Sequence, residues 1–302
     1  MASVHSYTLK FPQDLTPVAE SDASSRMTYD DFVAVSPDNN PATFTITRIQ
    51  ERIAAGHKSG NQVYRATMHV SSISLNGSVT VILKVAMGRT YVRNLLKEAE
   101  IYLDKLKPLF TSRVPHVYGF WQGETYEGQT AVMVMQDCGR PLKRDIVQQP
   151  PKFRQLVIDH LVAVHRAGVS FRDFGMDNVV AFQTPEGSFY PMLVGFGHAD
   201  GSHECPFKGD IGVYSPQPKE PLPCSQLWHV ALMAEAFYQY NVDFYGREIS
   251  LKTISSTMDL VKMRPEGISE AQALYDADDI IRRFNIWQDR RLAMDNGPVR
   301  LD

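Results

Sequence analysis

A carboxylic acid and a carboxamide five residues apart, Asp173 and Asn178, form the strongest chemical signal in this chain. They lie in the segment HRAGVSFRDFGMDNVV, which runs from an expected helix through a loop to an expected short strand. A carboxylate can accept or donate a proton in a reaction, and an amide oxygen can bind a hard metal ion. The alternative is a loop held in shape by turns of Asn and Asp side chains. The helix before the pair and the strand after it favour a site.

Two charged positions upstream bear on the same chemistry. Lys84 lies in the middle of the apolar run VILKV, where a lysine either points out to solvent or is held for a purpose. Glu98 follows on an expected helix, and Glu100 lies about 200° further round that helix. Either glutamate is a candidate partner for the lysine, and both can also be ordinary solvated charges.

Hydrophobic patterning predicts the elements that must position these residues. Five segments alternate in the manner of strands, and a helix with one apolar face follows the third of them and closes at Pro108. The expected strands cover residues 43–54, 62–70, 79–87, 114–121 and 130–136, and the helix covers about 91–107. This part of the chain therefore predicts a five-strand antiparallel sheet with one helix.

The rest of the chain is expected to be mainly helical. A helix opens at Pro150 and Pro151 and ends at Gly168, and the segments NVVAF and YPMLVGF predict a small hairpin. An apolar helix begins at SQLWHV, and SEAQALYDADDIIRRFNIWQDRRL predicts one amphipathic helix or a pair. The expected organisation is an N-terminal extension, a sheet-containing lobe and a helical lobe, at residues 1–42, 43–136 and 137–302.

Composition limits the classes of function. The chain has 302 residues, 43% of them hydrophobic, and a formal net charge of −3, which argues against a nucleic-acid partner. Three cysteines are too few for a disulfide framework and fit a reducing compartment. No apolar run reaches the length of a membrane span, and the first residues lack the apolar core of a signal peptide. We therefore expect a cytoplasmic protein without a membrane partner.

Several of these phrases together resemble the protein-kinase superfamily, and more narrowly the compact kinase-like proteins common in fungi. The resemblance covers about residues 43–240 and rests on VILKV, KEAEIYLDKLKP, MVMQDCGRPL, HRAGVSFRDFGMDNVV and GFGHAD. It implies an α+β, two-lobed protein-kinase-like fold whose cleft binds ATP and Mg²⁺. In that family the protein catalyses phosphoryl transfer mainly by positioning the reacting groups and by neutralising the charge of the phosphates.

The resemblance also implies a role for each candidate catalytic residue. Lys84 would contact the α- and β-phosphates of ATP, and Glu98 would pair with it, because Glu98 matches the family's spacing to the following Tyr102. Asp173 would accept or orient the proton of an attacking hydroxyl, with Arg172 before it as in many kinases. Asn178 would supply the amide oxygen that binds the metal.

The same resemblance places the nucleotide between a hinge and a phosphate-covering loop. Backbone groups of the hinge, near Gln136 and Cys138, would bond an adenine-type ligand. The loop would begin at Gly56 and contain Lys58, which either contacts phosphate or is a solvated lysine. The glycine pattern of this loop is eroded, since Lys58 and Asn61 stand where the family has its second and third glycines.

The main departure from the family is Gly195. The family has an aspartate there that chelates Mg²⁺, and a glycine side chain offers no ligand atom. Three hypotheses follow: an atypical kinase-like phosphotransferase acting on a protein or small-molecule hydroxyl, a pseudokinase that serves as a binding or scaffold module, and a kinase fold reused for other acid–base chemistry on a small molecule, with Asp173 as the acid or base.

Overall fold

A computed structural model gives the structure of this chain. It describes residues 8–10, 32–34, 43–55, 61–71, 76–125, 128–215, 217–237, 240–295 and 299. The chain divides into two compact units, each discontinuous in sequence. The first comprises residues up to 140 with 163–182 and 192–204, and the second comprises 141–162, 183–191 and 205–302.

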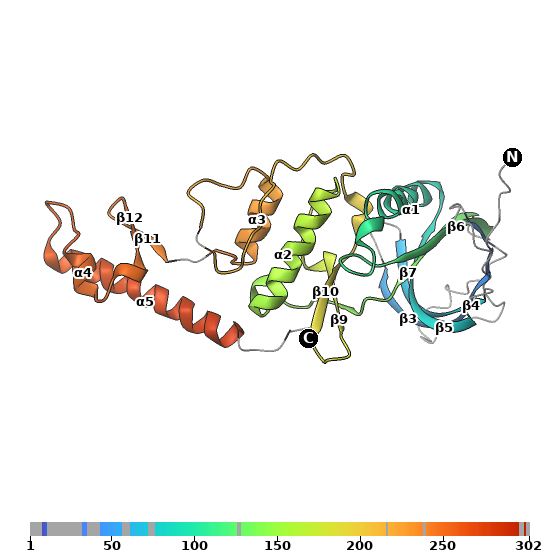
Figure 1. Cartoon of the computed structure of the whole chain (residues 1–302), viewed down its shortest axis with the longest axis horizontal. Helices are drawn as coiled ribbons and strands as arrows, with labels where there is room; N and C mark the ends of the chain where they lie inside the picture. The colour runs from blue at the N-terminus through green and yellow to red at the C-terminus, as the bar shows by residue number, and fades with distance from the viewer. Residues whose placement is uncertain are drawn as a thin grey trace. The chain divides into compact units, whose positions relative to one another are not determined.

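The first unit is built on a closed β-barrel (Figure 1). The five expected strands form its antiparallel part, in the spatial order β3-β4-β5-β7-β6. Two short strands complete the barrel: β1 pairs in parallel with β3, and β2 pairs with β1 and β6. The bounds are β1 Thr8–Lys10, β2 Phe32–Ala34, β3 Thr43–Ala55, β4 Asn61–Ser71, β5 Asn76–Met87, β6 Val117–Thr125 and β7 Gly128–Gln136. The first 42 residues, expected as an extension, thus contribute two strands to the barrel.

The barrel interior explains why these residues form strands. Alternate side chains of β5, Val81, Leu83 and Val85, are fully buried, and Val132 and Val134 of β7 join them in one apolar cluster. Each such side chain contributes about 1.5–3 kcal/mol by leaving water. The alternation directs the intervening residues of β5, Lys84 among them, to the other face of the sheet.

One helix of the first unit packs against strands β5 and β7 (Figure 1). Helix α1 spans Arg89–Glu100 and continues as a π-helical turn at Ile101–Lys105 and a 3₁₀ turn at Lys107–Leu109. Its buried face includes Leu95, Glu98 and Tyr102. The expected continuous helix therefore changes geometry after Glu100, and the π-helical turn carries Tyr102 at its buried side.

Shorter elements follow the barrel. Strands β8 (Arg140–Pro141), β9 (Val179–Gln183) and β10 (Phe189–Leu193) form a three-stranded sheet with β9 in the centre, which includes the expected hairpin. Helix α2 spans Pro151–Arg166, and 3₁₀ turns lie at Ile146–Gln148, Met176–Asn178 and Phe196–His198. The last two turns carry Asn178 and the residues after Gly195.

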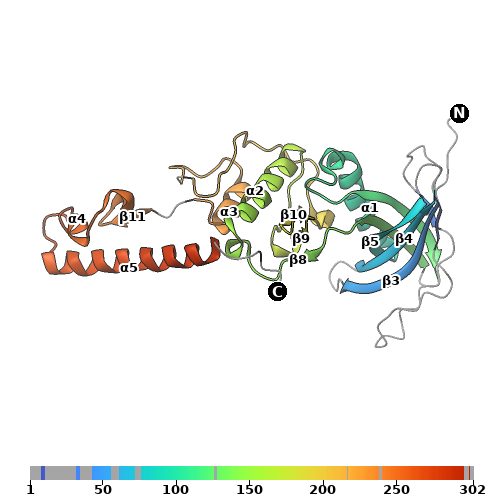
Figure 2. The same cartoon turned by 60° about the horizontal axis from the view of Figure 1, so that its bottom comes forward.

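The second unit ends in a small helical module around one long helix (Figure 2). The expected C-terminal helix or pair of helices is a single helix, α5, whose N-terminal half packs with α4 and the hairpin of β11 and β12 in an apolar cluster. The bounds are α3 Ser225–Met233, β11 Asn241–Phe244, β12 Arg247–Ser250, a 3₁₀ turn Leu251–Thr253, α4 Thr257–Val261 and α5 Glu270–Asp295. None of the described helices is both long enough and apolar enough to cross a membrane.

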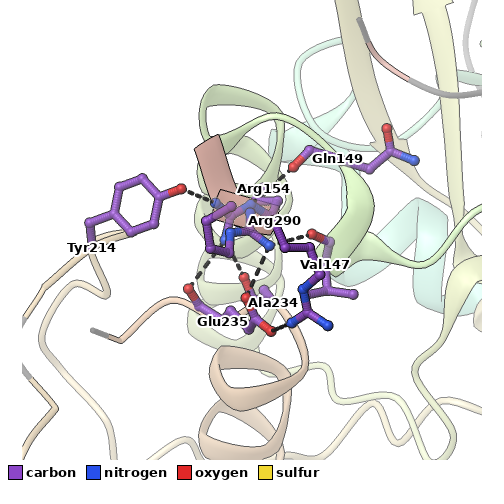
Figure 3. Close-up of polar contacts among 8 residues, drawn as sticks. Val147, Gln149, Arg154, Tyr214, Ala234, Glu235 and Arg290 are labelled. Carbon is purple, nitrogen blue, oxygen red and sulfur yellow. Dashed lines mark hydrogen bonds and ion pairs between the residues drawn. The ribbon is translucent and has the colours of Figure 1, made fainter. Parts of the chain in front are cut away.

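A buried arginine explains why α3 is shorter than its apolar sequence predicts. The fully buried guanidinium of Arg154 donates hydrogen bonds to the carbonyl oxygens of Ala234, at 2.6 Å, and of Gln149, at 3.1 Å, and to the hydroxyl of Tyr214 (Figure 3). Glu235, with φ of 44°, turns the chain directly after the helix. A buried charge must have its donors satisfied, and the carbonyls exposed at the end of α3 supply the acceptors.

Candidate functional site

The candidate site lies in the first unit, and its most distinct feature is an ion pair. Lys84 Nζ on β5 lies 2.5 Å from Glu98 Oε2 on α1. The Glu98 side chain is 1% exposed and that of Lys84 is 17% exposed. Glu100, the alternative partner, is exposed on the other side of the helix. The structure thus pairs Lys84 with Glu98. The carboxylate of the pair is buried, and the lysine side chain remains partly exposed.

The turn Gly195–Phe196–Gly197 covers this ion pair. A Cβ atom added to Gly197 would lie 2.9 Å from Glu98 Oε2, so the backbone approaches the carboxylate as closely as a glycine permits. Phe196 is fully buried, with its ring centroid 5.1 Å from that of Tyr102 and 4.5 Å from that of Phe171. These aromatic contacts anchor the turn, and Gly197 of the turn lies against the buried Glu98 carboxylate.

Asn178 fills the space beside Gly195. Its Nδ2 donates to the carbonyl oxygen of Val194 at 3.1 Å, and its Oδ1 accepts from the Gly175 N–H at 3.1 Å. Gly195 has φ of 81°, and a Cβ atom there would lie 2.9 Å from Asn178 Nδ2. The carboxamide therefore holds the loop together, and its oxygen keeps one lone pair for a further ligand.

Asp173 and Arg172 lie on the exposed segment before Asn178. The segment begins at Ser170, whose N–H and carbonyl bond those of Asp200 at 2.9 and 2.8 Å. This two-bond bridge fixes the start of the loop, while the Asp173 carboxylate faces solvent. An exposed carboxylate in a fixed loop can meet a hydroxyl of a bound substrate.

Asp200 is the carboxylate nearest in sequence to Gly195, where the resemblance implies a metal ligand. Its Oδ1 accepts hydrogen bonds from the Ser202 hydroxyl at 2.7 Å and from the Ser202 N–H at 2.9 Å. These bonds lower the pKa of Asp200, and the charges of His203 and Arg172 add to the effect. The ionised Asp200 carboxylate thus already accepts hydrogen bonds within its own turn, which makes it a poor ligand for a metal ion.

The expected hinge is held by residues that the sequence did not indicate. Arg65 of β4 donates to the Asp137 carboxylate at 2.7 Å and to the Gly139 carbonyl at 2.9 Å. Gln136 bonds His116 through its backbone N–H and through its side-chain oxygen. The expected hinge is therefore held by a side chain of β4 and by the residue that directly precedes β6.

Cys138 lies in this hinge as a buried thiol. Burial raises the pKa of Cys138 to about 12, and the charge of Asp137 adds to the rise. The thiol is therefore neutral at physiological pH and acts as a small apolar group. Gly56 and Lys58, the candidate phosphate-loop residues, lie outside the described residues.

The structure brings together Lys84, Glu98, Asn178 and Gly195, and it adds Tyr102 and Gly197. Tyr102 is fully buried, and burial raises its pKa, with the charge of Glu98 adding to the effect. Glycine at 197 and an aromatic residue four places after Glu98 were visible in the sequence, but their contact with the ion pair required the fold. No protein-family model matches this chain, and no curated protein matches it either.

Proposed function

We propose that this chain is an atypical kinase-like phosphotransferase that transfers a phosphoryl group from ATP to a hydroxyl of a protein or small molecule. The proposal includes a two-lobed kinase-like fold with the nucleotide between the lobes. The observation that carries it is the Lys84–Glu98 pair. The Glu98 carboxylate is 1% exposed and lies 2.5 Å from the lysine ammonium, and burying such a charge costs free energy. Buried charge pairs of this kind are common in functional sites, where the lysine can bind an anionic ligand.

The proposed reaction assigns one role to each charged group. Lys84 binds oxygen atoms of the α- and β-phosphates, and Glu98 fixes the position of its ammonium. The substrate hydroxyl oxygen forms a bond to the γ-phosphorus, and the bond from that phosphorus to the β–γ bridging oxygen breaks. The hydroxyl proton passes to the Asp173 carboxylate, and ADP leaves with the electron pair of the broken bond.

The donor set fits a tightly held Mg²⁺ poorly. Gly195 has no ligand atom, Asp200 is committed to Ser202, and the Asn178 oxygen already accepts one hydrogen bond. Mg²⁺ requires near-octahedral oxygen coordination. The reaction is therefore assigned to the chain's own residues alone, and slow turnover is expected.

The adenine is expected at the hinge. The Gln136 N–H already bonds the His116 carbonyl, and the Gly139 N–H bonds Asp137 Oδ1 at 3.0 Å. We therefore assign the adenine contact to the backbone of Cys138, between these two held positions. Arg65 stabilises this arrangement from outside through Asp137 and Gly139.

Calorimetric titration with ATP, with and without Mg²⁺, tests the binding half of this proposal. The wild-type chain is expected to bind ATP, and Lys84→Met is expected to weaken binding at least tenfold, because it removes the ammonium and keeps the length of the side chain. Lys97→Met is the matched control, since Lys97 lies on α1 and is exposed. Equal affinity of wild type and Lys84→Met would contradict the proposal.

Turnover tests the other half. With ATP labelled in the γ-phosphate, the wild type is expected to label a substrate or itself, and Asp173→Asn is expected to remove this labelling while ATP binding persists. Asp177→Asn is the control, because Asp177 is an exposed carboxylate of the same segment.

A second candidate function is a pseudokinase-like binding module, favoured by the arrangement of Asn178 and Gly195. The amide fills the place beside Gly195 and donates to the backbone, so this side of the site is complete without a metal. ATP binding that Lys84→Met abolishes, together with no turnover, would select this function.

A further inference from the structure

Two thiols that the proposed reaction does not use lie close together within the second unit. Cys205 and Cys224 are 7% and 4% exposed, and neither is in a disulfide. Their sulfur atoms lie within 4.8 Å of each other. A disulfide bond is about 2.0 Å long, so the two sulfur atoms need to approach by less than about 3 Å. A change of rotamer at one cysteine moves its sulfur by about this distance.

Each cysteine is held in place by its own surroundings. Cys224 is the residue directly before α3, and its carbonyl oxygen accepts the hydrogen bond of the Trp228 N–H at 3.0 Å. The Cys205 thiol donates to the carbonyl oxygen of Phe207, with the sulfur and oxygen 3.8 Å apart. The start of a helix and a short turn therefore fix the two backbones that a disulfide would join.

The segment between the two cysteines is itself attached to α2 within the same unit. Gln155 Nε2 donates to the Ile211 carbonyl at 2.8 Å, and Gln155 Oε1 accepts from the Val213 N–H at 2.6 Å. Arg154 donates to the hydroxyl of Tyr214 at 2.9 Å (Figure 3). A loop whose middle is anchored and whose ends already lie together has lost much of the conformational freedom that closing a ring would otherwise remove.

We propose that Cys205 and Cys224 form a reversible disulfide by exchange with a low-molecular-weight disulfide such as oxidised glutathione. One cysteine thiolate attacks a sulfur of oxidised glutathione, which forms a mixed disulfide and releases one glutathione. The second cysteine attacks the mixed disulfide and releases the other glutathione. The two cysteines are oxidised, the glutathione disulfide is reduced, and the two thiol protons end on the two glutathione molecules. The inference does not depend on the proposed phosphoryl transfer.

The environment of Cys205 determines how fast this exchange can run. Burial raises the pKa of Cys205, and the neighbouring Cys224 thiol adds to the rise. Because only the thiolate attacks a disulfide, the exchange is expected to be slow at neutral pH. The residues next to Cys205 on its C-terminal side, Pro206 and Lys208, are exposed, so a small movement of this segment admits glutathione to the sulfur.

Peptide mapping of the full-length chain tests the proposal directly. Folded protein is equilibrated with excess oxidised glutathione, its remaining thiols are alkylated, and it is digested with trypsin. Lys208 and Lys219 lie between the two cysteines, so a disulfide within one chain appears in the mass spectrum as two linked peptides. We expect this linked pair as the main oxidised product, while Cys138, a buried thiol with a pKa of about 12, stays reduced. Excess reduced glutathione should return both cysteines to thiols.

Two substitutions separate the pair from the third cysteine. Cys224→Ser is expected to accumulate one glutathione adduct on Cys205, because the thiol that would displace the glutathione is missing. Cys138→Ser is the matched control, since it also replaces a buried cysteine, and it is expected to form the linked peptides to the same extent as the wild type.

A comparison of folded and urea-unfolded wild type keeps the test valid if a variant fails to fold. At a fixed ratio of oxidised to reduced glutathione, the ratio of Cys205–Cys224 disulfide to dithiol is expected to be at least tenfold higher in the folded protein, because the fold holds the two thiols together. The proposal is overturned if this ratio is no higher in the folded protein than in urea. Glutathione adducts on both cysteines without linked peptides would overturn it too.

Discussion

The two sides of the candidate site handle charge in opposite ways. On one side Lys84 and Glu98 bring a full positive and a full negative charge together beneath a glycine turn. On the other side Asn178 and Gly195 are neutral, and the Asn178 carboxamide forms hydrogen bonds with backbone atoms. The structure therefore sets a paired lysine on one side, which the proposed function assigns to an anionic ligand, and a neutral amide and glycine on the other. Under the proposed function, the charged side would bind phosphate, and the neutral side would contribute little to its activation.

The largest expected effect comes from leaving Glu98 without its cation. Lys84→Ala strands a carboxylate that is 1% exposed, and we expect a loss of about 2–3 kcal/mol in the free energy of unfolding, below the value for a fully buried pair because Lys84 is 17% exposed. Urea denaturation measures the change. The control Glu100→Gln, on the exposed face, should shift stability by less than about 0.5 kcal/mol. Equal effects at the two positions would show that the pair does not organise this side of the site.

Closing the space above the ion pair should have a somewhat smaller effect. Gly197→Ala places a methyl group 2.9 Å from Glu98 Oε2 and must displace either the turn or the carboxylate, at a cost of about 1–3 kcal/mol. Thermal unfolding and ATP affinity should both fall. Gly77→Ala is the control, because a Cβ atom there meets nothing within 4 Å. A fully stable Gly197→Ala variant with unchanged ligand affinity would mean that the turn does not cover Glu98 in solution.

Restoring a carboxylate on the neutral side sharpens the comparison. Gly195→Asp adds a metal ligand, but its Cβ atom must displace Asn178 Nδ2 and adopt φ near 81°, so a stability loss of about 1 kcal/mol is expected. Gly195→Asn imposes the same strain without the charge. In calorimetry the aspartate variant should gain Mg²⁺-dependent ATP affinity at least fivefold over the asparagine variant. No difference between the two would mean that Mg²⁺ binding does not depend on a carboxylate at this position.

The smallest effect concerns Asp200, the carboxylate nearest in sequence to the neutral side. Hydrogen bonds from Ser202 lower its pKa, so the ionised form stabilises the folded state above the ordinary aspartate pKa of 3.8. This stabilisation is lost as the pH falls through the lowered pKa. Ser202→Ala should therefore be less stable than wild type at pH 7, and the difference should shrink in acid. A difference that does not change with pH would assign the effect to packing.

Much of the barrel was predictable because its signal is local. The five strands follow from alternation along the chain, and α1 follows from the apolar face that Leu95 and Ala99 share. Strands β1 and β2 were missed because three residues carry too little periodicity to distinguish a strand from a loop, and their pairing with β3 and β6 is a tertiary effect. The premature end of α3 was missed because Arg154 lies far from it in sequence.

The candidate site shows the same division. Lys84 and Asn178 were identifiable by residue type and position, and Glu98 was preferred to Glu100 through the family resemblance. The structure brings all three to one unit. The close approach of Gly197 to Glu98 and the support of the hinge by Arg65 were not, because each depends on a contact between distant segments. Sequence patterns thus indicated the charged groups, whereas the residues that hold them in place required the fold.

Closure of the barrel by its shortest strands sets the order in which the chain can mature during synthesis. Strands β3, β4 and β5 are neighbours in sequence and can pair soon after they leave the ribosome, but β2 pairs Val33 with Gln122 and must wait for β6. Until β7 has been made, β5 lacks its second neighbour and has an open edge, and such edges recruit other chains. The nascent protein is therefore most vulnerable to aggregation in the interval between the emergence of β5 and that of β7, when a chaperone would have the most to protect.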